Sequence, residues 1–182
     1  MANYWRKRAF AELSTEPNDL AKRGLVYLLH RFFTVPGSGS VHFGLATNSV
    51  EVEFQFYDIT TTTGIIRAEL IEAPTATLFG PEIQGHNLNR NFADEQTATL
   101  QAASAVSGGL SVASELIGNA SKAGGIVAQS KVHTLRNETT YVMAFHNVEN
   151  QPSLTHLNLG WSEGKPEPYA LIQEGINLGG TT

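Results

Sequence analysis

The chain has 182 residues, of which 41% are hydrophobic and 16% charged, and it carries a net charge of −5 and no cysteine. This length fits one domain with one core, and the composition argues against a chain that is disordered throughout. The lack of cysteine excludes disulfides and cysteine-based zinc sites, the acidic balance disfavours nucleic acid as a partner, and no apolar run is long enough to span a membrane, so we expect a soluble protein made in a cytoplasm.

The first 23 residues differ in composition and pattern from the rest of the chain and are expected to form an N-terminal arm. A helix-compatible stretch at residues 9–13 is followed by a turn-like run that contains Pro17, which disfavours helical geometry before it. A basic and aromatic cluster near the start suits docking onto an acidic protein surface, and a solvated chain end is the alternative. The predicted partner-binding residues of this arm are Tyr4, Trp5, Arg6, Lys7 and Arg8.

A β region is expected to follow the arm. Residues 25–35 form an apolar run that we interpret as a buried strand, and residues 36–40 form a turn rich in glycine and proline. Apolar and polar side chains alternate over residues 50–57, which predicts a strand with one packed face and one wet face. Residues 65–71 predict a second strand, and the two strands are expected to form a hairpin.

Residues 73–96 read as a long loop rich in Pro, Gly, Asn and Asp, and a long loop within a compact domain is often functional. Short strands are expected near residues 97–101, 109–113 and 126–135. The segment around residues 112–116 could hold a short helix instead.

The last two predicted strands can be paired about a bend at Gln151. In that register three pairs of large apolar side chains face one another, and a shift by one residue would place them opposite polar neighbours. The pairs are Phe145 with Leu157, Met143 with Leu159, and Tyr141 with Trp161.

The same register places His146 opposite His156, close enough in principle to share a metal ion. A zinc site needs a third ligand and supporting partners, which nearby sequence does not supply, so cross-strand polar packing without a metal or cofactor is the favoured interpretation. No Gly-x-Ser-x-Gly elbow occurs, and Glu51 and Glu53 alternate with core residues as a solvated strand face does. We therefore expect that the protein is not an enzyme.

Residues 164–182 are expected to form a C-terminal extension. Its apolar side chains would be exposed if it hung loose, which favours docking onto a partner. The predicted contact residues are Tyr169, Leu171 and Ile172. Between arm and extension, residues 24–163 have short strands separated by Gly, Pro and Asn turns, which predicts a mainly β domain, an antiparallel β-sandwich or jelly roll.

Three segments carry a resemblance to a known family: Asn87 to Asn91, Thr134 to Tyr141, and Leu157 to Trp161. In these segments the chain resembles small structural proteins of tailed-phage virions, over roughly residues 45–165. The resemblance implies no enzymatic residues. It implies a decoration or cement protein of the virion that binds the major capsid protein or another virion protein on the outer head, reinforces contacts between capsomers, and forms a homo-oligomer, for which we expect a trimer.

Two alternatives stay open at this stage. A tail, baseplate or receptor-binding fibre component would have the same fold class and a different position in the particle. A carbohydrate-binding or hydrolytic jelly roll would need aromatic side chains clustered in loops, whereas Trp161 falls in a predicted core strand and the loop at residues 73–96 holds only Phe79 and Phe92.

Overall fold

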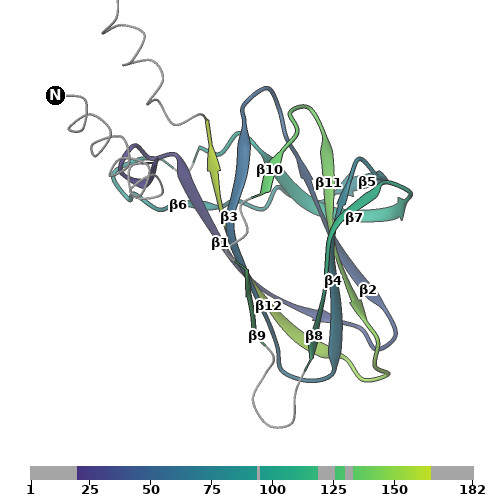
Figure 1. Cartoon of the computed structure of the whole chain (residues 1–182). Coiled ribbons are helices and arrows are strands. Elements are labelled where there is room, and N and C mark those ends of the chain that lie inside the picture. The colour runs from purple at the N-terminus through teal and green to yellow at the C-terminus, as the bar shows by residue number, and fades with distance from the viewer. Residues whose placement is uncertain (1–19, 94, 119–125, 130–132, 165–182) are drawn as a thin grey trace, which may run out of the picture.

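Two antiparallel sheets pack face to face as a β-sandwich, as the sequence predicts (Figure 1). The computed structural model describes residues 20–93, 95–118, 126–129 and 133–164. Sheet A has the order β10-β3-β12-β1-β6, with β9 paired to β3. Its strands are β1 (Val26–Val35), β3 (Val52–Thr61), β6 (His86–Asn87), β9 (Ile126–Gln129), β10 (His133–Leu135) and β12 (Ser153–Glu163).

Sheet B has the order β5-β7-β2-β11-β4-β8. Its strands are β2 (Ser40–Ala46), β4 (Ile65–Glu72), β5 (Thr75–Phe79), β7 (Thr99–Ser107), β8 (Leu110–Gly118) and β11 (Thr140–Asn147). The segment around residues 112–116 is therefore strand, and the helical alternative is wrong. The predicted loop at residues 73–96 contains the short strands β5 and β6.

Consecutive strands cross between the sheets. β1 and β2, β3 and β4, and β11 and β12 each lie in opposite sheets. This interleaving gives β1-β12-β3 with β9 and β10 in one sheet and β2-β11-β4-β8 in the other, the strand order of a jelly roll. The hairpin predicted for residues 50–57 and 65–71 is therefore wrong. Alternation identifies which face of a strand is buried, but it does not determine which other strands pair with that strand.

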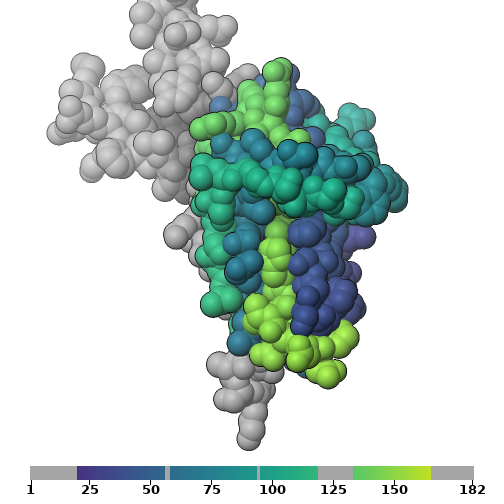
Figure 2. Space-filling view, turned by 90° about the vertical axis from the view of Figure 1, so that its right-hand side faces the viewer, coloured from purple at the N-terminus to yellow at the C-terminus, as the bar shows by residue number. Residues whose placement is uncertain are grey.

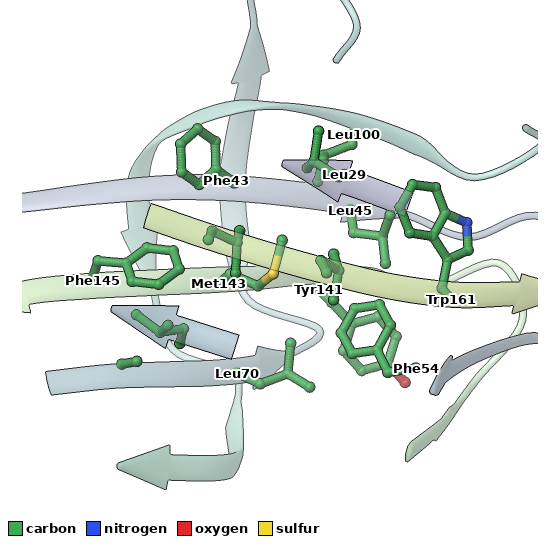
Figure 3. Close-up of a cluster of buried hydrophobic side chains, with 14 of the residues drawn as sticks. Leu29, Phe43, Leu45, Phe54, Leu70, Leu100, Tyr141, Met143, Phe145 and Trp161 are labelled. Atoms are coloured by element: carbon green, nitrogen blue, oxygen red, sulfur yellow. The ribbon is translucent and has the colours of Figure 1, made fainter. Parts of the chain in front are cut away.

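The predicted hairpin of the last two strands is also wrong. β11 pairs with β2 and β4, whereas β12 pairs with β1 and β3. The apolar side chains of both strands nevertheless share one dry layer, because they meet across the sandwich and not along a ladder (Figure 3). Six of them, each at most 7% exposed, are Tyr141, Met143, Phe145, Leu157, Leu159 and Trp161.

An irregularity in β3 shifts its buried face. Val52 and Phe54 are buried and alternate with half-buried neighbours, as predicted. The pairing with β12 then passes from Phe54 to Phe56, so that Gln55 is skipped and the buried positions become Ile59 and Thr61. A bulge of this kind adds one residue to one strand and reverses the facing of those that follow.

A two-stranded ribbon folds back over the outer face of sheet B. The β4–β8 ladder continues into the β5–β7 ladder, and β7 also pairs with β2 at the other side of the sheet. Figure 2 shows this ribbon as a teal band across the other strands. Beneath it lies a second small apolar cluster, which includes Val142, Ala144 and Leu78. Gly44 permits this close approach, because a Cβ there would overlap Leu78.

Candidate functional site

The candidate site is the end of the sandwich from which both terminal segments depart. Val26 pairs with Ser162, and the Glu163 amide donates to the Leu25 carbonyl at 2.9 Å. The Gly164 amide donates to the Glu51 carbonyl, also at 2.9 Å. Segments 1–19 and 165–182 therefore attach to the domain at neighbouring points.

We call this end the arm base and define it as residues 20–25, 87–92, 95–98 and 163–164. Residues 20–22 are helical and Leu20 is buried. The predicted partner-binding residues fall on the segments that the arm base carries. Tyr4, Trp5, Arg6, Lys7, Arg8, Tyr169, Leu171 and Ile172 all lie outside the described residues.

Asn87 fastens the N-terminal side of the arm base. Its side chain is buried, and Nδ2 donates to the Gly24 carbonyl at 2.7 Å while Oδ1 accepts from the Asn89 amide at 2.9 Å. Asn89 Nδ2 in turn donates to the Lys22 carbonyl at 2.8 Å. Asparagine supplies a donor and an acceptor in one side chain, so it can close its own loop and hold a distant backbone at once.

Glu163 fastens the other side of the arm base and is only 3% exposed. Its Oε2 accepts from the Thr97 amide at 2.6 Å and from Thr97 Oγ1 at 2.5 Å. Its Oε1 accepts from the Ala98 amide and from Trp161 Nε1, each at 3.0 Å. A buried carboxylate is tolerated when hydrogen bonds satisfy its oxygens, and here they tie β12 to the chain segment that enters β7.

Sequence reasoning flagged the loop at residues 73–96 and missed both fastening residues. The partner of Asn87 lies 63 residues away in the chain and that of Glu163 lies 66 residues away, so local patterns carry no signal for either. Trp161, which falls in a predicted core strand, is buried as predicted.

The predicted facing pair of His146 and His156 is wrong, because the two residues lie in different sheets. His146 packs edge-on against His42 on sheet B, with ring centroids 5.8 Å apart. His156 stacks on Phe32 on sheet A, with centroids 4.3 Å apart. Within the described ranges, no three His, Asp or Glu side chains are arranged to hold a metal ion.

A chain of polar contacts links β2, β11 and β4 on sheet B. Ser40 Oγ lies 2.7 Å from His146 Nδ1, and His146 Nε2 lies 3.3 Å from Glu69 Oε2. Hydroxyl, imidazole and carboxylate in this order also occur in acyl-transfer triads, which need amide donors for the oxyanion. The amides of Ser38 and Gly39 are instead bonded to the carbonyls of Glu149 and Pro36. The geometry supports cross-strand polar packing.

His42 makes this face sensitive to pH. Burial lowers the pKa of His42 below its ordinary value of 6.5, and the neighbouring His146 lowers it further. The folded state therefore takes up this proton less readily than the unfolded state, so the stabilising contribution is complete above about pH 6.5 and is lost as the pH falls.

Thermal unfolding measured between pH 7.5 and pH 5 should show a falling melting temperature, and His42→Gln should flatten that decline. Leu116→Ala, an exposed change that removes no titrating group, serves as the control and should leave the slope as in the wild type. An unchanged slope in His42→Gln would rule out this histidine as a source of the pH dependence.

A scan of protein-family models, a search of curated proteins and a search of solved structures found no match to this chain. In the part of the chain that the structure describes, no helix is both long and apolar enough to cross a membrane.

Proposed function

We propose that the chain is a structural protein of a tailed-phage virion, a decoration or cement protein that binds the major capsid protein on the outer head. The observation that carries this proposal is the arm base, from which two candidate docking segments leave a jelly-roll domain at one end. Jelly rolls serve in capsids and also in lectins, so the fold alone does not select the function.

The arm base suits a protein that reinforces an assembly. Two segments that reach neighbouring subunits convert weak contacts into avidity, provided that their attachment points are held at a fixed spacing. The buried bonds of Asn87 and Glu163 supply that fixed spacing, because each ties a chain end to the body of the sandwich. The resemblance at Asn87 to Asn91 falls on the same end of the molecule.

Co-sedimentation of the purified protein with undecorated capsids tests the proposal. The wild type should pellet with capsids, and a variant lacking residues 1–19 should bind about tenfold more weakly or worse, since one of two linked contacts is lost. Leu116→Ala, an exposed change on β8, is the control that should bind normally. Failure of the wild type to pellet, or attachment to isolated tails in place of heads, would overturn the proposal. Analytical ultracentrifugation of the free protein tests the trimer that the resemblance leads us to expect.

A further inference from the structure

Sheet A has an open strand position beside β1. β12 pairs with the whole length of β1, from Val26 to Val35. On the other side, β6 pairs with Tyr27 and Leu28 alone, and no other described strand continues that ladder. The edge from Leu29 to Val35 is thus open within the described part of the chain.

Backbone hydrogen bonds show which residues face this open edge. The Leu25 carbonyl accepts from Glu163 on the β12 side, and the Val26 carbonyl accepts from Leu88 on the β6 side. Successive residues of a strand direct their backbone groups to opposite sides. The N–H and C=O groups of His30, Phe32 and Thr34 therefore point outward from the open edge, where an added strand would pair with them.

Side chains flank the open edge on both faces of the sheet. On the outer face Phe32 is 68% exposed and its ring is held by stacking on His156. On the inner face the Arg31 guanidinium lies 5.5 Å from the centre of the Phe43 ring. Arg31 is exposed, and it forms no ion pair with any carboxylate among the described residues.

We propose that this edge binds an extended segment of a partner protein by strand addition, with a carboxylate of that segment facing Arg31 and apolar side chains on either side of it lying over Phe32. Main-chain pairing supplies affinity in such complexes and alternate side chains supply specificity. Charge selects a partner over a second copy, because β1 has the sequence VYLLHRFFTV and contains no acidic residue to face Arg31. This inference goes beyond the proposed function and does not depend on it.

A nine-residue peptide of alternating threonine and valine, with a central glutamate flanked by valines, is the probe. It is titrated into the full chain labelled with ¹⁵N, and the amide signals of residues 29–35 should shift. Thr34→Pro should weaken binding about tenfold, since proline removes an edge donor and is tolerated on an edge strand. Arg31→Glu should weaken binding of this peptide and strengthen binding of the same peptide with lysine at its centre.

Three results would overturn the inference. The first is that the glutamate peptide binds wild type, Thr34→Pro and Arg31→Glu equally, or that it does not bind wild type even at millimolar concentration. The second is a dimer of the free protein that Thr34→Pro dissociates, which would assign the edge to a second copy. The third is strong protection of the His30, Phe32 and Thr34 amides from hydrogen exchange in the monomer without peptide, which would assign the edge to the chain's own segments.

Discussion

Replacing Glu163 by glutamine is expected to lower the free energy of unfolding by about 3 kcal/mol, since charge-assisted hydrogen bonds contribute roughly 1.5–3 kcal/mol each and a buried mismatch adds to their loss. The carboxylate accepts four hydrogen bonds, from Thr97, Ala98 and Trp161. Glutamine has the same shape but offers one oxygen and an NH₂ group. Whichever way the amide turns, its NH₂ group faces at least one N–H donor, the Thr97 amide in one orientation or the Ala98 amide and the Trp161 indole in the other.

Urea unfolding followed by circular dichroism measures this loss. Glu53→Gln is the matched control, because Glu53 is a half-buried carboxylate of sheet A that accepts only side-chain hydrogen bonds, and it should cost less than about 1 kcal/mol. In a Trp5→Phe background Trp161 is the remaining tryptophan, and its fluorescence reports directly on the lost indole contact. Equal midpoints for the two glutamine variants would contradict the fastening role of Glu163.

The sequence predicted which face of each strand is buried better than it predicted which strands pair with one another. The alternation around Val52 and Phe54 identified the buried face, and the six bulky residues near the end of the chain do share one layer. Two strands whose apolar sides meet across a sandwich have the same periodicity as two strands paired in a hairpin. Sequence pattern cannot separate these arrangements, and it therefore predicts β11 and β12 side by side in one sheet, whereas they face each other from two sheets.

The candidate site was less accessible to sequence reasoning for a related reason. Glu163 ends an apolar strand just before Gly164, where an exposed carboxylate would be equally natural. Its burial depends on donors of Thr97 and Ala98, on the segment that leads into β7 of the opposite sheet. Asn87 lies in a loop that was flagged as functional, yet its hold on Gly24 depends on the β1–β6 pairing. Both roles follow from topology, which composition and periodicity leave undetermined.

Replacing Asn87 by alanine is expected to loosen the N-terminal side of the arm base. The change removes the donor to Gly24 and the acceptor for the Asn89 amide and leaves the buried Gly24 carbonyl without that partner, at a cost of about 2–3 kcal/mol. Because these bonds hold residues 20–25 and the loop, hydrogen exchange should accelerate there by about tenfold or more while the core strands of sheet B exchange as before. Mass spectrometry of peptides from both regions measures the difference.

Asn91→Ala is the control within the same loop, since Asn91 is exposed and its hydrogen bonds reach only Asn89. Uniform acceleration across both sheets in Asn87→Ala would show that the residue stabilises the whole fold and not the arm base. Avidity requires both terminal segments and a fixed spacing between their attachment points. Asn87→Ala separates these two requirements, because it keeps both segments and alters only how firmly the N-terminal one is attached. If fixed spacing at the arm base matters for capsid binding, Asn87→Ala should pellet less with undecorated capsids than Asn91→Ala does, although both variants retain a folded sandwich.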